Sequence, residues 1–224
     1  MALSDKRILK EMEAGNIIIS PFDQTNLSTS SYDVTLGEYY FPEQEDGSTV
    51  YNPFSRQDVD RVWGTEPMTA KTAEEVFCDT PFVFDGIAKE DRVILLDPGE
   101  TILAHTNEFI GGRSRITTMM KARSSLGRNF IEVCKCAGWG DVGYTNRWTM
   151  EITNNSRRHS IPLVVGRRIA QIIFIETGEI LGDDYTQSGK YQATTDFVET
   201  MQETWDPRAM LPRMYHDREI KHTH

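Results

Sequence analysis

The chain has little cysteine, little positive charge and no long apolar runs. Its three cysteines are Cys78, Cys134 and Cys136 in 224 residues. An odd count without a framework spacing argues against a disulfide scaffold and favours a reducing compartment. No segment approaches the ~18 apolar residues that a membrane span needs, and the N-terminus lacks the apolar run of a signal peptide. We therefore predict a cytoplasmic protein with no membrane partner.

Positive charge is scarce overall and unevenly spread. The chain has 24 Lys and Arg against 34 Asp and Glu, a net charge of −10, which argues against a general nucleic-acid binder. Basic residues gather in the second half of the chain: Lys121, Arg123, Arg128, Arg147, Arg157, Arg158, Arg167 and Arg168. Because a local arginine cluster can dominate its own pocket, a small anion is an acceptable ligand where a nucleic acid is not.

Several catalytic and metal-binding motifs are missing. The His-x-Glu and Pro-Cys-x-x-Cys pattern of zinc deaminases does not occur, nor does a Gly-x-Ser-x-Gly elbow or a Rossmann fingerprint. Cys134 and Cys136 are expected on one face of a strand, with no second pair to complete a zinc site. His216, His222 and His224 crowd at a terminus, where a frayed tail is the commoner arrangement. We predict a protein without a metal centre of its own.

Short apolar segments at intervals of roughly ten residues predict a mainly β fold, a sandwich or a barrel. One amphipathic helix precedes them: Ser4 is its expected N-cap, Ile8, Leu9 and Met12 recur at helical spacing, and Gly15 ends it. Strands are expected at 16–20, 31–36, 81–84, 92–96, 101–105, 108–110, 160–165 and 168–176, and a short helix at 197–201.

The segment 43–75 interrupts this pattern. Gly and Pro punctuate a polar stretch without sustained periodicity, which predicts a long loop or insertion. Trp63 within it is expected to be a packing anchor rather than a ligand. The chain has no internal repeat and no obvious linker, so one domain is predicted.

Residues 123–128, here called the arginine turn, are the first candidate binding group. Arg123, Ser124 and Ser125 are followed closely by Arg128. Guanidinium forks match phosphate oxygens with paired hydrogen bonds, and hydroxyl groups fill further acceptor positions. The same composition also suits a solvated helix start with a serine cap, and both interpretations stay open.

Two carboxylates follow the arginine turn. Asp141 follows two glycines in three residues, so it either forms a turn or accepts a hydrogen bond from a sugar hydroxyl. Glu151 lies in a strand whose alternate residues are apolar, so its side chain faces either solvent or a cavity. In a cavity, burial would raise the carboxyl pKa and make Glu151 a competent general acid or base. Tyr144 could stack on a ring or pack in the core.

Six segments of the chain match, in order, the pattern of a known family. They are LSDKRILKEMEAGNIIISP (3–21), SSYDVTLG (30–37), LLDPGETILAHTNEFI (95–110), RSSLGR (123–128), AGWGDVGYTNRWTMEITNN (137–155) and GRRIAQIIF (166–174). Together they resemble the dCTP deaminase branch of the trimeric dUTPase superfamily. The resemblance implies a domain over 1–192 with a loop insertion at 43–75, and a C-terminal extension over 193–224 that we expect to pack on a neighbouring subunit.

The resemblance implies a mainly β, dUTPase-like barrel or distorted jelly roll with a short N-terminal helix and minor helical pieces. Such subunits form homotrimers with active sites between subunits. The implied activity is zinc-independent hydrolytic deamination of dCTP to dUTP and ammonia, with Mg²⁺ carried by the triphosphate. Residues 137–139 are similar to bifunctional members, which go on to dUMP and pyrophosphate. The same pattern would also suit a dUTPase-like diphosphatase, or a nucleotide-binding regulator that is not an enzyme.

The resemblance also implies roles for individual residues. Glu151 would take a proton from a water held by Ser124 and the Ala137 carbonyl, and Arg128 would support the site electrostatically. Asp141 would accept from the deoxyribose hydroxyl. The residues implied to bind triphosphate, sugar and base, or to close over them, are Arg123, Ser124, Ser125, Asp141, Tyr144, Tyr185, Lys190 and Gln192.

Overall fold

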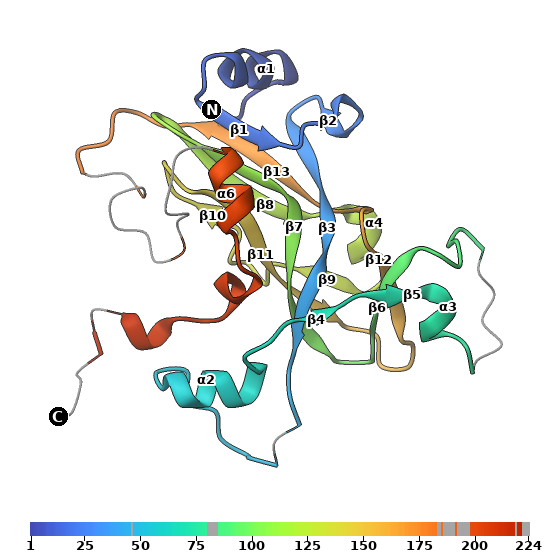
Figure 1. Cartoon of the computed structure of the whole chain (residues 1–224). Coiled ribbons are helices and arrows are strands. Elements are labelled where there is room, and N and C mark those ends of the chain that lie inside the picture. The colour runs from blue at the N-terminus through green and yellow to red at the C-terminus, as the bar shows by residue number, and fades with distance from the viewer. Residues whose placement is uncertain are drawn as a thin grey trace.

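The computed structural model describes residues 1–45, 47–79, 85–182, 185, 191, 198–217 and 219–220. The strand predicted at 81–84 lies outside these residues, as do Lys190 and Gln192 of the expected tail site. Within the described part the fold is mainly β, as predicted, with short helices at the periphery of a curled sheet (Figure 1).

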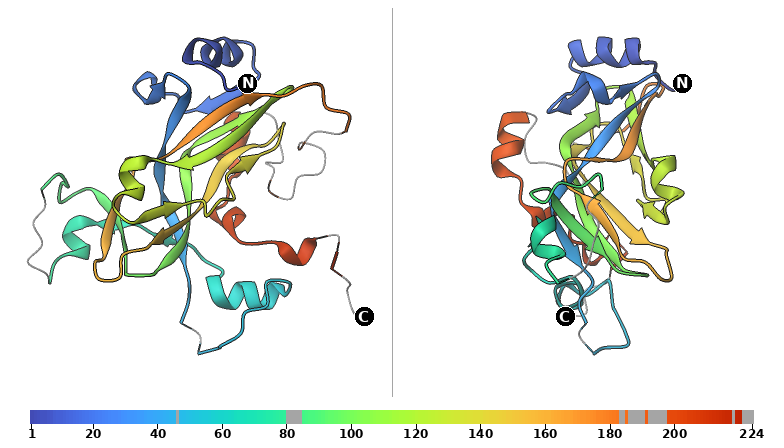
Figure 2. Two further views of the ribbon diagram at one scale, coloured as in Figure 1. Left: turned by 180° about the vertical axis from the view of Figure 1, so that it is seen from behind. Right: turned by 90° about the vertical axis from the view of Figure 1, so that its right-hand side faces the viewer.

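The large sheet has ten strands and curls into a half-barrel (Figures 1 and 2). Its strands are β1 (Ile17–Ser20), β2 (Leu27–Ser28), β3 (Ser31–Pro42), β4 (Met68–Thr69), β7 (Thr101–Gly112), β8 (Ile116–Ala122), β9 (Ile131–Val133), β10 (Trp139–Gly140), β11 (Thr145–Asn154) and β13 (Arg168–Glu176). The main path is β10-β8-β13-β3-β7-β11-β9, with β1 paired to β7 and both β2 and β4 paired to β3. A smaller sheet orders β12 (Ile161–Val164), β6 (Arg92–Leu96) and β5 (Lys71–Thr72).

The helices are short. They are α1 (Asp5–Glu13), α2 (Arg56–Trp63), α3 (Ala73–Val76), α4 (Ser124–Gly127), α6 (Val198–Thr204) and the 3-10 helices η1 (Gln24–Asn26), η2 (Pro207–Met210) and η3 (Met214–His216). As predicted, α1 starts at Ser4, whose side chain accepts from the Arg7 N–H, and the chain turns at Gly15 with φ +76°. Figures 1 and 2 show α1 at the opposite end of the molecule from α2. No helix in the described ranges is long and apolar enough to cross a membrane.

The prediction of a long loop at 43–75 is wrong for much of that segment, which contains α2, α3, β4 and β5. Helix α2 begins where the Ser55 side chain accepts from a backbone N–H, and it buries Val59 and Val62. Two apolar residues on a short helix give too weak a periodicity to detect in a polar stretch. Trp63 packs against an apolar cluster, as the packing-anchor prediction expects.

The core lies inside the curl of the large sheet. Its fully buried side chains include Tyr32, Val34, Ile102, Ala104, Met150, Ile152, Ile172 and Phe174. The strands predicted at 101–105 and 108–110 are one strand, β7. The polar pair Thr106 and Asn107 breaks the apolar alternation, but Thr106 is paired with Leu36 of β3 and is itself buried.

The chain beyond β9 differs from the predicted strand. Cys134, Lys135 and Cys136 all have positive φ, of 70°, 36° and 69°. Cys134 is buried and Cys136 is exposed, and both are free thiols. The prediction that the two thiols share one strand face is therefore wrong, because the strand ends at Val133 and a left-handed turn leads directly to Ala137.

Candidate active site

Glu151 faces a cavity of about 300 Å³, here called the Glu151 cavity. The alternation along β11 places Trp148, Met150 and Ile152 in the core and leaves Glu151 on the opposite face, as predicted. Burial raises the pKa of the Glu151 carboxyl, and the positive charge of Lys135 offsets this in part. The sequence left two surroundings open for the Glu151 side chain, solvent or a cavity, and the structure places it in a cavity.

Four further residues from the predicted site line the same cavity: Ala137, Asp141, Tyr144 and Tyr185. The Trp139 indole donates from Nε1 to Asp141 Oδ1 over 3.1 Å, which fixes the direction of that carboxylate. The ring of Tyr144 meets that of Tyr185 edge-on at 5.3 Å, and burial raises the pKa of its phenol. Residues from 137 to 185 are thus brought around one carboxyl group.

Two glycines set the position of the cavity residues Ala137 and Asp141. A Cβ at Gly138 would lie 2.4 Å from the Met120 carbonyl oxygen, and one at Gly140 would lie 2.4 Å from Thr118 Oγ1. Real Cβ atoms essentially never approach other atoms this closely. Only glycine therefore lets β10 run so close to β8, and this approach positions the flanking Ala137 and Asp141.

The C-terminal extension supplies cavity residues that the sequence interpretation missed. Trp205, Ala209, Met210 and Pro212 also line the Glu151 cavity. The extension was expected to pack on a neighbouring subunit, but its described part packs on its own chain. The signal available in the sequence was the set of apolar residues at 205–212 within a polar tail. Contact with a neighbouring subunit stays a prediction.

The arginine turn does not line this cavity. Ser124 and Ser125 lie in α4 and Arg128 follows it, and all three are exposed. Arg123 is half-buried, with Nε 3.4 Å from Asp33 Oδ2. The same Asp33 oxygen is 3.1 Å from a nitrogen of Arg168. The two halves of the predicted site are therefore in different places within one chain.

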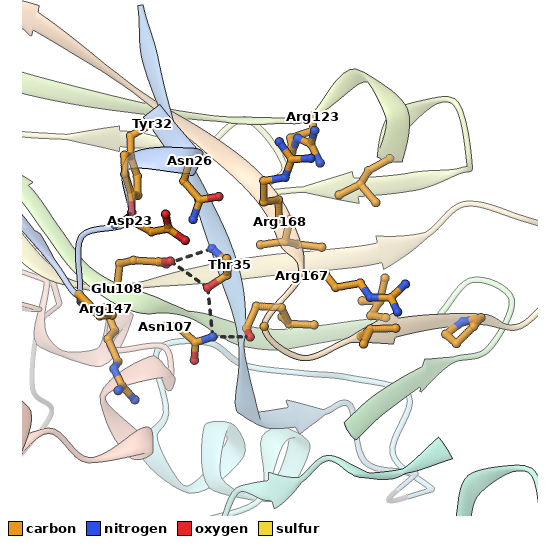
Figure 3. Close-up of a pocket in the computed structure, with 18 of the residues that line it drawn as sticks. Asp23, Asn26, Tyr32, Thr35, Asn107, Glu108, Arg123, Arg147, Arg167 and Arg168 are labelled. Carbon is orange, nitrogen blue, oxygen red and sulfur yellow. Dashed lines mark hydrogen bonds between the residues drawn. The ribbon is translucent and has the colours of Figure 1, made fainter. Parts of the chain in front are cut away.

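Arg123 instead lines a second, wider cavity of about 920 Å³, here called the arginine cavity (Figure 3). Figure 3 shows Arg123, Arg167 and Arg168 on one side of it and Arg147 on the other. Arg147 also lines the Glu151 cavity, so the two cavities meet at this side chain. The buried Glu108 accepts from the N–H and the hydroxyl of Thr35 at 3.0 and 2.8 Å, and burial raises its pKa.

Potential metal ligands do not gather in the described part of the chain. No group of three or more His, Cys, Asp or Glu side chains there is placed to hold a metal ion. Of the terminal histidines, His216 lies on η3, while His222 and His224 lie outside the described residues. The absence of zinc from the chemistry stays a prediction.

Comparison with known proteins identifies the family. The family model described as dCTP deaminase-like matches residues 2–177. The chain belongs to the dCTP deaminase-like family. Two relatives named "dCTP deaminase, dUMP-forming" are similar to it over most of their length. The protein of Hydrogenobaculum sp. is 34% identical over 183 residues, covering 80% of this chain and 85% of the relative. That of Persephonella marina is 29% identical over 196 residues, covering 86% and 92%.

A solved structure supports the same fold. The 2'-deoxycytidine 5'-triphosphate deaminase from Agrobacterium tumefaciens aligns with a TM-score of 0.51 at 18% identity, covering 77% of this chain and 47% of that chain. The dCTP deaminase-like match ends at residue 177. The wall formed by Trp205, Ala209, Met210 and Pro212 therefore lies beyond the matched segment.

Proposed function

We propose that the protein is a hydrolytic deaminase of dCTP in which Glu151 transfers the protons. The supporting observation is the position of Glu151 in a cavity where burial raises the pKa of its carboxyl. A carboxyl group with a raised pKa is a better general base, and it can return the proton at neutral pH. A surface glutamate would lack both properties.

The reaction uses one water molecule. Glu151 takes one proton from this water, while the other O–H group donates a hydrogen bond to the backbone carbonyl of Ala137, a residue that lines the same cavity. The oxygen bonds to the cytosine carbon that carries the amino group. As the new carbon–oxygen bond forms, the electron pair of the ring C=N bond moves to N3. Glu151 then passes the proton to the amino nitrogen, the bond to that nitrogen breaks as ammonia leaves, and the proton left on the new hydroxyl moves to N3 to give the uracil ring. Ser124 helps to hold the water, and Arg128 supports the site electrostatically.

The sugar is held by Asp141 and Tyr144, which line the same cavity. Asp141 accepts from a deoxyribose hydroxyl, and its hydrogen bond from Trp139 keeps the carboxylate in one orientation. Tyr144 packs near the sugar, with Tyr185 edge-on against it. Closure over the phosphates by Lys190 and Tyr185, with Gln192 among the residues that bind the substrate, belongs to the same proposal.

The complete site needs a second copy of the chain. The exposed Ser124, Ser125 and Arg128 lie outside the Glu151 cavity, and a copy in a cyclic assembly can present its own arginine turn to that cavity. Heterologous contacts that close into a ring place the same pair of surfaces at each interface. We propose a homotrimer that shares its sites in this way, with a nucleotide as ligand.

Magnesium would arrive with the nucleotide. The carboxylate beside the arginine turn, Asp33, already pairs with both Arg123 and Arg168. The two arginines suit phosphate oxygens, and Asp33 is already paired with them and does not offer a free carboxylate to a cation. The ion would therefore be held by the triphosphate itself. When bound there, Mg²⁺ neutralises phosphate charge. Arg123 and the two serines then bind the remaining phosphate oxygens.

The names of the relatives favour the bifunctional prediction, in which the product is dUMP and not dUTP. The relatives of Hydrogenobaculum and Persephonella are named as dUMP-forming, and residues 137–139 are similar to bifunctional members. We therefore favour a protein that also cleaves dUTP to dUMP and pyrophosphate over one that releases dUTP. Asp141 would organise the water for this second hydrolysis.

One incubation tests the proposal. The purified protein is mixed with dCTP and Mg²⁺, the nucleotide product is identified, and ammonia and pyrophosphate are measured. We expect dUMP with both by-products. Formation of dUTP with ammonia alone would indicate a deaminase only, and cleavage of supplied dUTP without ammonia release from dCTP would indicate a diphosphatase. Release of neither by-product from either nucleotide would contradict an enzymatic function.

A further inference from the structure

The C-terminal extension covers the sheet face on which Glu151 stands. In the register of β11 and β7, Glu151 is paired with Leu103 and Arg147 with Phe109; in that of β3 and β7, Phe41 is paired with Leu103. Phe41, Leu103 and Phe109 are 0%, 4% and 1% exposed. Figures 1 and 2 show the chain that follows α6 lying along this side of the sheet.

Trp205 anchors the covering segment. Its ring centroid is 4.6 Å from that of His105 on β7, and the Arg147 guanidinium carbon is 4.7 Å from the same indole. Arg147 also lies 5.2 Å from the ring of Phe109, so its guanidinium is held by two aromatic rings. Cation–π contacts of this kind strengthen when they are desolvated.

The partner ring beneath Trp205 is itself fixed. His105 Nδ1 is 2.8 Å from the Thr106 carbonyl oxygen, and the Tyr39 N–H donates to Nε2 over 3.3 Å. Further along the segment, Met210 and Leu211 are buried against Phe41 and Leu103. The segment Trp205–Pro212, here called the C-terminal wall, is thus attached to the sheet at both ends.

The part of the wall beside Glu151 is apolar. Leu103, the direct neighbour of Glu151 on β7, is in the apolar cluster that contains Met210. Ala209, Met210 and Pro212 line the cavity together with Leu103. None of these four side chains carries a hydrogen-bond donor or acceptor suited to a nucleobase.

Cytosine offers two different edges beside the carbon that reacts. One neighbour of that carbon is N3, a hydrogen-bond acceptor, and the other is C5, which carries only hydrogen. An acceptor buried against apolar side chains loses its bond to water without replacement. If Glu151 acts on the amino-bearing carbon, the apolar side of the cavity therefore suits the C5 edge and not N3.

We propose that the C-terminal wall is part of the nucleotide site, contacting the C5 edge of the cytosine ring and limiting the size of a substituent there. This inference rests on the proposed function for the orientation of the base. Ala209 has the smallest side chain of the wall, so a larger side chain at this position would add volume to the cavity that it lines.

The test measures binding of dCTP and 5-methyl-dCTP by calorimetry in a Glu151→Gln background, where turnover is removed. Ala209→Leu should weaken 5-methyl-dCTP binding by about tenfold or more and dCTP binding by less than about threefold, since one methyl group in a pocket is worth at least that much discrimination. The matched control is Thr200→Leu, which adds the same side chain on the exposed face of α6 and should change neither affinity.

A second variant covers the case in which Ala209→Leu displaces the wall. Ala209→Gly only removes a methyl group and should improve binding of 5-iodo-dCTP relative to dCTP by about threefold. Equal losses for both nucleotides in Ala209→Leu together with an unchanged ratio in Ala209→Gly, or unchanged ratios in both Ala209 variants, would overturn the inference. Discrimination between the two nucleotides at C5, without ammonia release from dCTP in the unaltered protein, would overturn the proposed function. The inference that the C-terminal wall contacts the C5 edge would then stand. Ammonia release without discrimination would overturn the inference and keep the proposed function, and failure of both dCTP and 5-methyl-dCTP to bind would overturn both.

Discussion

The arginine turn and the Glu151 cavity differ in nearly every physical respect. The turn is exposed at Ser124, Ser125 and Arg128, and its half-buried Arg123 forms an ion pair with Asp33. The cavity encloses its carboxyl group, which stands on β11 beneath the C-terminal wall. Phosphate binding needs donors that a charged ligand can reach, whereas proton transfer by a carboxylate benefits from exclusion of water.

On our proposal, this difference lets one short stretch of sequence bind phosphate and transfer protons. Only a few residues separate the turn from β9, yet a left-handed turn at 134–136 and the change of strand direct the following residues to another cavity. Within a single chain, Ser124, Ser125 and Arg128 do not line the Glu151 cavity. Proximity in sequence therefore joins two functions that, on our proposal, meet only across an interface between copies.

The largest effect should come from removing the carboxylate in the cavity. Glu151→Gln keeps the shape of the side chain but cannot accept a proton, so kcat for ammonia release should fall by about 10²–10⁴-fold. Binding of dCTP should stay measurable by calorimetry. Glu132→Gln, on the neighbouring strand β9, is the matched control and should leave kcat unchanged. An unchanged rate in Glu151→Gln would mean that another group is the base.

A substitution in the arginine turn should show the opposite pattern. Arg123→Ala removes charged hydrogen bonds to phosphate, each worth about 1.5–3 kcal/mol, so KM for dCTP should rise by about 10–100-fold with a smaller change in kcat. Arg115→Ala, whose partner is the exposed Glu179, should change neither constant. A fall in kcat alone would place Arg123 in the chemical step and weaken the contrast between the two regions.

Gly37→Ala should damage the cavity and spare the arginine turn. The added Cβ would lie 2.0 Å from His105 Cε1, so the ring that supports Trp205 must move or the strands must separate. Overpacking of this kind costs about 1–3 kcal/mol or more in free energy of unfolding. At Gly178 nothing lies within 4 Å of the added Cβ, so Gly178→Ala should be nearly neutral. Equal stability of the two variants in denaturant unfolding would contradict the packing described here.

Acid should destabilise the cavity side through His105. Burial lowers the pKa of His105 from 6.5 to about 4, so between these values the unfolded chain binds a proton that the folded chain does not. Its contribution to stability is present above pH 6.5 and is lost as the pH falls towards 4, on the order of 3 kcal/mol in total. In His105→Phe the loss of unfolding free energy over this window should be smaller. An equal loss would assign the acid sensitivity to other groups.

The sequence predicted what depends on local pattern. The alternation around Glu151 placed that side chain opposite the core face, and the cap at Ser4 and the glycine at 15 gave the bounds of α1. Helix α2 was not predicted because its buried face contains only two apolar residues, Val59 and Val62. The residues with positive φ at 134–136 are not glycines, so the residue types at these positions did not predict the end of the strand.

The remaining errors arose from long-range contacts. No local pattern links Trp205 to His105 or Met210 to Leu103, because these pairs meet only after the sheet has formed. The separation of the arginine turn from the Glu151 cavity likewise follows from tertiary structure. A linear motif records the order of functional residues but not which copy of the chain brings each one to the ligand.

The sharing of sites between copies is tested most directly by mixing two inactive variants. Glu151→Gln and Arg128→Ala are unfolded together in equal amounts, refolded, and assayed for ammonia release from dCTP. If each site takes Glu151 from one chain and Arg128 from the next, random assembly should restore roughly one quarter of the unaltered activity. If both residues act within one chain, every site in the mixture carries a defect. Activity no higher than that of the separate variants would then contradict our account.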